Sequence, residues 1–215
     1  MAKNNLKQQA YSIIKEKIMN CEFAPGMFLN EEILCETVHT SRTPVREAVS
    51  RLEQEGLISV MPKRGIVISE LTLKDVNMIF ELRLLLEPYA LKQYGPLLSE
   101  EELLYYYQFF SSPYSTSNSE NFFEVDSNFH LWIINSSKNI YLIKNYELLH
   151  TQNLRFRILT GKRSQQRLED TCKEHLDILD ACLKKDWEKA AQTLGFHLQK
   201  SKNCTFDLLL ARQLQ

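Results

Sequence analysis

The amino-acid sequence predicts a mainly α-helical chain with a small mixed domain first and an all-helical domain after it. Up to about residue 69, short helical patterns are followed by two short apolar, partly β-branched runs, residues 58–61 and 66–69, which indicate a β-hairpin. The residues between the runs, Pro62 to Gly65, are typical of a turn with a basic tip. Beyond residue 71 the apolar positions recur at helical spacing throughout. We therefore expect two domains, residues 1–70 and 71–215.

Turn-forming residues divide the all-helical part into about six expected helices. The expected breaks are Gly95-Pro96, Ser111 to Ser119, Ser136 to Asn139, Thr160-Gly161 and Lys185-Asp186. No apolar run approaches the roughly 18 residues needed to span a bilayer, and the first ten residues lack the basic-then-apolar profile of a secretory signal. We therefore expect a cytoplasmic protein without a membrane partner.

Composition and charge narrow the classes of function. With 44% hydrophobic and 25% charged residues, the chain is typical of a soluble globular protein. The net charge is −1, and residues 1–69 carry nine basic and eight acidic side chains. This balance disfavours a generic polyanion binder, so a nucleic acid would have to meet basic residues concentrated on one face. The five cysteines are odd in number and never spaced C-x-x-C, which favours reduced thiols over disulfides or a cysteine zinc site.

Two short helices joined by a tight turn are predicted between residues 30 and 57. The turn lies at His39-Thr40, and we expect the second helix to start with Thr43 as N-cap and Pro44 at its first position, where a missing N–H costs nothing. Gly56 suits the left-handed position that ends a helix. The apolar residues that would pack the two helices together are Leu34, Val38, Val45, Ala48, Val49 and Leu52.

The second of these helices presents cationic side chains at its start. Arg42 and Arg46 point outward near the N-terminus, where free backbone N–H groups and the helix dipole favour a phosphate. An arginine one turn into the helix can form a bidentate pair with a guanine edge in the major groove. Lys63 and Arg64 at the hairpin tip would reach the minor groove or the DNA backbone. A solvated helix face is the alternative for any one arginine, but the whole pattern predicts a DNA-binding winged helix-turn-helix of three helices plus a hairpin wing.

A known family shares these features. The stretch SRTPVREAVSRLEQEGLISVMPKRGIVIS from Ser41, with APG at Ala24 to Gly26, resembles the DNA-binding domain of GntR-family regulators. His39 departs from the family pattern, which usually has a glycine in this turn; histidine tolerates a positive φ better than most residues, so we expect modest strain and the same fold. The resemblance implies that the residues in contact with DNA are Arg42, Thr43 and Arg46, with the wing around Arg64-Gly65 assisting.

Three of the later helices carry titratable groups in the middle of apolar stripes. Asp126 and His130 stand four residues apart and therefore share one helix face, while His175 and His197 lie among apolar residues of two further helices. Burying an unpaired carboxylate is costly, and a divalent cation would satisfy all four groups, because three imidazoles and one carboxylate suit Zn²⁺ or Ni²⁺. A single histidine on an apolar face is more often a satisfied core residue, and this alternative stays open. His150 has no matching partner, and we expect it to be structural or exposed.

This region also resembles a known domain, the FCD domain of the FadR-type GntR subfamily, over roughly residues 71–212. The resemblance lies in ELRLLLEPYAL from Glu81, D-x-x-x-H at Asp126 and His130, EHLDILDACLKKDWEKA from Glu174, and His197. It implies an all-α antiparallel helical bundle that encloses a metal ion on which a small carboxylate effector sits. In the metal-binding members an Asp and three His hold the ion, and the corresponding residues here are Asp126, His130, His175 and His197.

Arg83 is the candidate contact for the effector. It falls on the inward face of its helix and could pair the effector's carboxylate in a bidentate fork. An internal salt bridge to Glu87, one turn further on, is an equally good interpretation.

The function predicted from these features is that of a homodimeric, effector-responsive transcription regulator that binds a pseudo-palindromic operator in double-stranded DNA. Two alternatives remain. The metal itself, Zn²⁺ or Ni²⁺, could be the signal, or the three histidines and one aspartate could form a metal-dependent hydrolase. We disfavour the enzyme because the sequence has no HExxH motif, no nucleophile elbow and no general base beside the ligands.

Overall fold

The computed structural model describes residues 2–62, 64–160 and 164–213. The chain divides into two compact units between Thr72 and Leu73. The prediction of a mainly helical chain with a winged helix-turn-helix before an all-helical domain is confirmed. Each unit is described by itself below.

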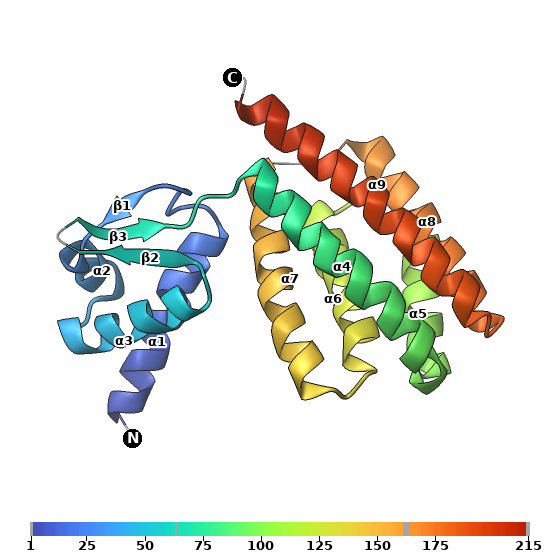
Figure 1. Ribbon diagram of the computed structural model, residues 1–215, viewed down its shortest axis with the longest axis horizontal. Coiled ribbons are helices and arrows are strands. Elements are labelled where there is room, and N and C mark those ends of the chain that lie inside the picture. Colours follow the sequence, from blue (N-terminus) through green and yellow to red (C-terminus); the bar gives the residue numbers. More distant parts are fainter. Residues whose placement is uncertain (1, 63, 161–163, 214–215) are drawn as a thin grey trace. The chain divides into compact units, whose positions relative to one another are not determined.

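The N-terminal unit combines three helices with a small antiparallel sheet (Figure 1). Helix α1 packs against α3 and α2, and side chains from all three helices form the core with the buried face of the sheet. The core positions include Ile14, Ile18, Leu34, Val45, Leu52, Leu57 and Ile68. The elements are α1 (Ala2–Met19), β1 (Phe28–Leu29), α2 (Glu31–Val38), α3 (Arg42–Gln54), β2 (Ile58–Met61) and β3 (Gly65–Ile68).

Particular residues mark the ends of α2 and α3. Helix α2 ends at His39, which adopts the left-handed conformation with φ 51°, as expected from the sequence. Helix α3 begins two residues earlier than predicted, because Ser41 and not Thr43 is its N-cap. Pro44 therefore occupies the third helical position, which it can hold because the first turn of a helix needs no backbone donor for its own hydrogen bonds. At the other end, Gly56 has φ 68° just past the helix, as predicted.

The wing has one strand more than the sequence indicated. Strand order is β1-β3-β2, with both pairs antiparallel, so the predicted hairpin gains a two-residue neighbour on its free side. Gly65 makes this pairing possible: its φ is +100°, and a Cβ there would lie 2.6 Å from the carbonyl oxygen of Leu29. A strand of two residues is too short for any alternation of apolar and polar residues to reveal it.

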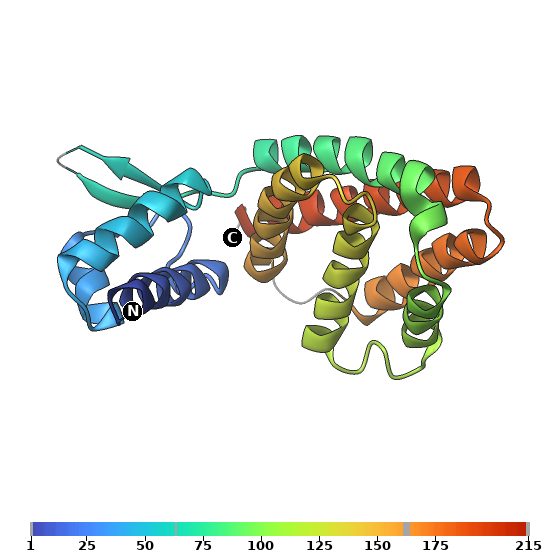
Figure 2. The same cartoon turned by 90° about the horizontal axis from the view of Figure 1, so that it is seen from below.

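The C-terminal unit is built from helices (Figures 1 and 2). The helices are α4 (Leu73–Tyr94), the short 3₁₀ helix η1 (Gly95–Leu97), α5 (Glu100–Ser111), α6 (Ser119–Asn135), α7 (Ile140–Thr160), α8 (Gln165–Leu183) and α9 (Trp187–Gln213). Helix α4 packs along α9 and also contacts α6 and α7, while α8 packs against α9 and α5. Among the helices of the described residues, none has the length and apolar character needed to cross a bilayer.

Candidate metal centre and DNA-binding surface

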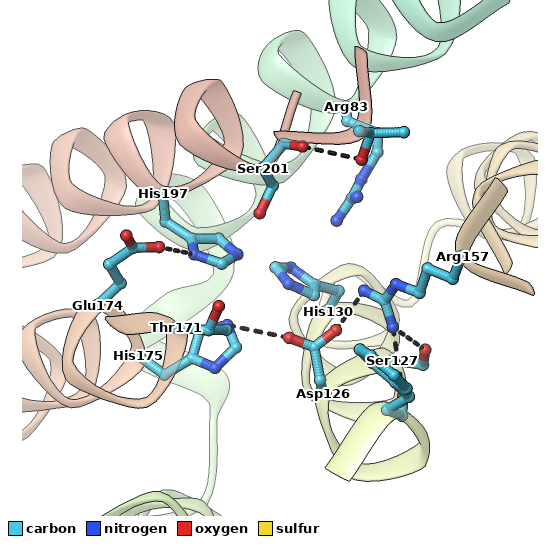
Figure 3. A network of polar contacts seen from close by, with 12 residues as sticks. Arg83, Asp126, Ser127, His130, Arg157, Thr171, Glu174, His175, His197 and Ser201 are labelled. Atoms are coloured by element: carbon cyan, nitrogen blue, oxygen red, sulfur yellow. Dashed lines mark hydrogen bonds and ion pairs between the residues drawn. The ribbon is translucent and has the colours of Figure 1, made fainter. Parts of the chain in front are cut away.

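Four titratable side chains from three helices converge inside the C-terminal unit (Figure 3). Asp126 and His130 come from α6, His175 from α8 and His197 from α9, and we call them the buried cluster. One ligand atom from each lies within 4.8 Å of all the others, and no member is more than 3% exposed. Two atoms bonded to one ion at about 2 Å are at most about 4 Å apart, so small side-chain shifts would close the cluster around an ion.

The imidazole nitrogens in the buried cluster are poorly satisfied. Within the described residues, Nε2 of His130 and both ring nitrogens of His175 are buried and have no hydrogen-bond partner. The ring centroids of His175 and His197 are 4.5 Å apart, and those of His130 and His197 are 5.2 Å apart. Buried polar atoms are rarely left unpaired. The donor set and its unpaired nitrogens therefore fit a divalent cation.

A carboxylate supports His130 from behind. Nδ1–H of His130 donates to Oε2 of Glu87 at 2.6 Å, and Oε1 of Glu87 accepts from Arg83 Nε and from the Tyr146 hydroxyl, each at 2.6 Å. Burial alone would raise the pKa of Glu87, but the charge of Arg83, together with the hydrogen bonds from His130 and Arg83, holds that pKa well below its usual value. Glu87 is therefore ionised and can only accept, which leaves the His130 Nε2 lone pair facing the cluster.

His197 has the same kind of support. Its Nδ1–H donates to Oε2 of Glu174 at 2.8 Å. Arg167 donates two hydrogen bonds to Glu174, from Nη1 to Oε1 at 2.7 Å and from Nη2 to Oε2 at 3.0 Å. Nζ of Lys200 also lies 3.3 Å from Oε1 of Glu174. Burial lowers the pKa of His197 to about 4, against the opposing effect of Glu174. The ring is therefore neutral at pH 7, the state in which imidazole binds metals.

An arginine holds Asp126. The Arg157 guanidinium pairs with Oδ2 of Asp126 and also donates to the Ser127 hydroxyl at 2.8 Å. Burial would raise the pKa of Asp126, but the charge of Arg157 lowers it far below its usual value. The other oxygen, Oδ1, faces the cluster, 3.6 Å from Nε2 of His175. Asp126 therefore presents one charged oxygen inward.

His175 is positioned by packing. Its ring lies 4.4 Å from the Phe110 ring and 4.9 Å from the Phe129 ring, centroid to centroid. Burial lowers the pKa of His175 well below its ordinary value. This residue is therefore also neutral, and it is oriented by aromatic contacts where His130 and His197 are oriented by carboxylates.

The remaining candidates of this unit are not members of the buried cluster. Arg83 is engaged by Glu87, the salt bridge that was one of its two interpretations, and both side chains are buried. His150 is half-buried and outside the cluster, and burial lowers its pKa to about 4.

The candidate DNA-binding residues lie on the surface of the N-terminal unit. Arg42, Thr43 and Arg46 are exposed on α3, and Arg64 is exposed at the start of the wing strand, beside Gly65. Nε of Arg46 donates a hydrogen bond to Oε1 of Glu31 on α2 at 2.7 Å. This contact leaves the two terminal nitrogens of its guanidinium available to a ligand. Lys63 lies outside the described residues.

Sequence reasoning missed the residues that support the cluster. Glu87 was recognised only as a partner of Arg83, although it also contacts His130. Glu174 was quoted only as part of a motif, and nothing in the sequence distinguishes Arg157 and Arg167 from other arginines. Their contacts depend on how α6, α7, α8 and α9 are placed relative to one another, which helical periodicity does not determine.

A winged helix-turn-helix joined to a helical domain with a buried polar centre defines a DNA-binding transcriptional regulator. Residues 6–68 match the family described as "Bacterial regulatory proteins, gntR family", and residues 78–200 match the family described as "FCD domain". The chain belongs to the GntR family and carries an FCD domain of the FadR-like subfamily.

Relatives of known sequence agree with this assignment. The chain is 30% identical over 194 residues to the HTH-type transcriptional regulator YdhC of Bacillus subtilis, covering 88% of this chain and 86% of YdhC. It is 26% identical over 201 residues to the HTH-type transcriptional repressor RspR of Escherichia coli, covering 91% of this chain and 86% of RspR. These relatives are regulators, which confirms the prediction that the chain is not an enzyme.

Solved structures share the fold. E. coli McbR/YncC superposes with a TM-score of 0.75 at 23% identity, covering 94% of this chain and 97% of that one. The Zn²⁺-bound FCD domain of TM0439 superposes with a TM-score of 0.57 at 22% identity, covering 66% of this chain and 98% of that domain. At these identities the likeness concerns the fold alone.

Proposed function

We propose that this regulator binds a divalent metal ion at Asp126, His130, His175 and His197 and a small carboxylate effector on that ion, and that the effector controls DNA binding. The observation that carries this proposal is the convergence of four buried ligand atoms within 4.8 Å. A Zn²⁺-bound FCD domain of the same fold, that of TM0439, supports it. Three nitrogen donors and one oxygen donor make Zn²⁺ or Ni²⁺ the expected ion.

The supporting contacts agree with a metal role. Histidines that bind metals usually donate their second N–H to a carboxylate, as His130 does to Glu87 and His197 to Glu174. A bound ion would supply a Lewis-acidic position for an oxygen of the effector. Arg83 remains our candidate for the effector's second contact, because its side chain extends toward His130 (Figure 3). An effector would have to share Arg83 with Glu87 or displace Glu87 from the Arg83 guanidinium.

Calorimetry tests the effector and separates it from metal sensing. We expect small organic acids to give binding heat with Zn²⁺-loaded protein and none with metal-free protein. If no acid gives heat but metal alone changes DNA affinity, the metal is the signal, as in the alternative predicted above. If neither metal nor acid binds, the sensor role fails.

For DNA we propose contacts from α3 and the wing, with the N-terminal residues 1–70 as the reading domain and residues 71–215 as the sensor. The proposed contacts are Arg42, Thr43, Arg46, Lys63, Arg64 and Gly65. We expect Arg46→Ala to weaken operator binding by about 1–3 kcal/mol if its terminal nitrogens pair with a guanine. A gel-shift titration at fixed salt measures this, with Lys74→Ala, on an exposed part of the sensor helix α4, as control. Wild-type affinity in Arg46→Ala would remove Arg46 from base reading.

We also propose a homodimer, which a pseudo-palindromic operator requires. Helix α4 supports it with a stripe of exposed apolar side chains spaced four, three and four residues apart: Met78, Leu82, Leu85 and Tyr89, each 43–62% exposed. A charge in this stripe would face the partner's copy of the same surface, so Leu85→Glu should give monomers in sedimentation equilibrium while Leu104→Glu on α5 does not. Dimers that persist in Leu85→Glu would exclude the stripe as the interface.

Because such a regulator acts where the DNA is, we place it in the cytoplasm.

A further inference from the structure

The three charged contacts that support the buried cluster differ in how far they are sealed from solvent. Arg83 and Glu87 are 3% and 0% exposed, and Arg157 and Asp126 are 11% and 4% exposed. The contact behind His197 is the most open of the three, because Arg167 and Glu174 are 15% and 10% exposed and Glu174 also pairs with Lys200, which is 64% exposed. This difference makes the Glu174 contact the point where solvent comes closest to the cluster through charged groups.

A groove between α8 and α9 reaches this point. Its volume is about 1000 Å³, and Glu174, His197 and Lys200 are among its lining residues. A neighbouring hollow of about 420 Å³ is lined by Arg167 as well as by Glu174 and Lys200. His197 is therefore the cluster member that borders the groove, while Asp126 and the other two histidines are absent from its lining.

Arg167 is the residue that fixes Glu174 at this border. Its two hydrogen bonds to the two carboxylate oxygens form a bidentate fork, which determines the plane of the carboxylate. The same carboxylate accepts from Nδ1 of His197 at 2.8 Å, so its plane sets the direction of the ring. Arg167 also reaches the Ser201 hydroxyl at 3.4 Å, which ties the fork to α9. Lys200 touches one oxygen at a single point and cannot define a plane.

We propose that Arg167 is a positioning residue for the metal centre, a proposal that rests on the metal site proposed above. Through Glu174, Arg167 holds His197 in line with the ion and keeps the ion from leaving by the α8–α9 groove. Without the fork, Glu174 rotates toward the groove, His197 loses its acceptor, and water competes for the ion at this side. Loss of such a supporting contact typically lowers metal affinity by 10–100-fold.

The test uses the full chain, stripped with a chelator and reloaded with Zn²⁺ or Co²⁺ alone. For Arg167→Met we expect a 10–100-fold higher Kd for Zn²⁺, release to excess chelator at least 10-fold faster than wild type, and a changed Co²⁺ absorption spectrum. Arg167→Lys should recover part of the loss, because it restores the charge but not the fork. The matched control is Lys173→Met, a cation that lines the same hollow and, among the described residues, forms an ion pair with Asp170 and not with Glu174. It should stay within twofold of wild type.

The outcomes separate this proposal from the one it depends on. If wild type itself binds no Zn²⁺, the metal centre fails and Arg167 loses its role with it. If wild type binds Zn²⁺ while Arg167→Met keeps its affinity, release rate and spectrum within twofold, the positioning role alone is wrong. Should Arg167→Met not fold by circular dichroism, Glu174→Gln gives the same readouts. An unchanged spectrum and release rate in that variant would overturn the proposal.

Discussion

Removal of the metal ion should destabilise the sensor domain, and His175 is the ligand whose substitution tests this most directly. Both of its ring nitrogens lack hydrogen-bond partners among the described residues, and Nε2 lies 3.6 Å from Oδ1 of Asp126, so His175→Ala breaks no hydrogen bond of the metal-free protein. It does lose the ring contacts with Phe110 and Phe129. The informative quantity is therefore the difference in stability with and without metal, measured within each variant, because the packing loss is common to both conditions.

The size of this difference follows from linkage. The four ligand atoms are already close in the folded chain, so the ion binds the folded state and stabilises it by RT ln(1 + [M]/Kd). At a free metal concentration 100 times Kd this is about 2.7 kcal/mol. For a domain of roughly 140 residues, about 4 °C per kcal/mol converts it to a rise in Tm of about 10 °C.

Differential scanning calorimetry of the full chain, with excess Zn²⁺ and with chelator, measures the shift. We expect about 10 °C for wild type, near zero for His175→Ala, and a wild-type shift for His150→Ala, a histidine outside the cluster. The reasoning fails if wild type melts at the same temperature in both conditions. It also fails if His150→Ala loses the shift as completely as His175→Ala.

Three further substitutions probe the fold. Gly65→Ala should lower the free energy of unfolding in urea by more than about 2 kcal/mol, because the φ of this residue is +100° and a Cβ would meet the Leu29 carbonyl. A decrease of less than about 0.5 kcal/mol would contradict this. Gly95→Ala should cost about 1–3 kcal/mol and alter tryptophan fluorescence, because its Cβ would lie 2.3 Å from the Trp187 ring; unchanged emission and Tm would argue against it. Burial lowers the pKa of His150 from 6.5 to about 4, so as pH falls from 7.5 to 5 the unfolded chain gains a proton that the folded chain does not. Over this pH range the metal-free wild type should therefore lose about 2 kcal/mol more stability than His150→Leu. Equal losses in the two proteins would refute this.

Local features of the fold were predictable because single residues determine them. His39 and Gly56 mark helix ends through their tolerance of positive φ, and both lie where the sequence placed them. The start of α3 was misplaced because Ser41 and Thr43 are both good N-caps, and Pro44 is acceptable at more than one position of the first turn. Strand β1 was missed because it forms only by pairing with β3, far along the chain.

The candidate site was predictable only in part, for the same reason. Asp126 and His130 share a helix face, which spacing reveals, and His175 and His197 were recognised because they lie among apolar residues of two further helices. The contact from Arg167 through Glu174 to His197 links two helices whose relative rotation no periodicity determines. Helix packing angles therefore had to be known before the surroundings of the cluster could be described.

The pairing of acids with arginines inside the sensor domain has an electrical consequence. Asp126 in the cluster and the carboxylates of Glu87 and Glu174 beside it each pair with an arginine, so these six groups carry no net charge. A divalent ion would add two positive charges that these three pairs do not offset, at a depth where water screens poorly. An incoming acid would supply the missing negative charge, so ion and acid should each tighten the binding of the other by the same factor.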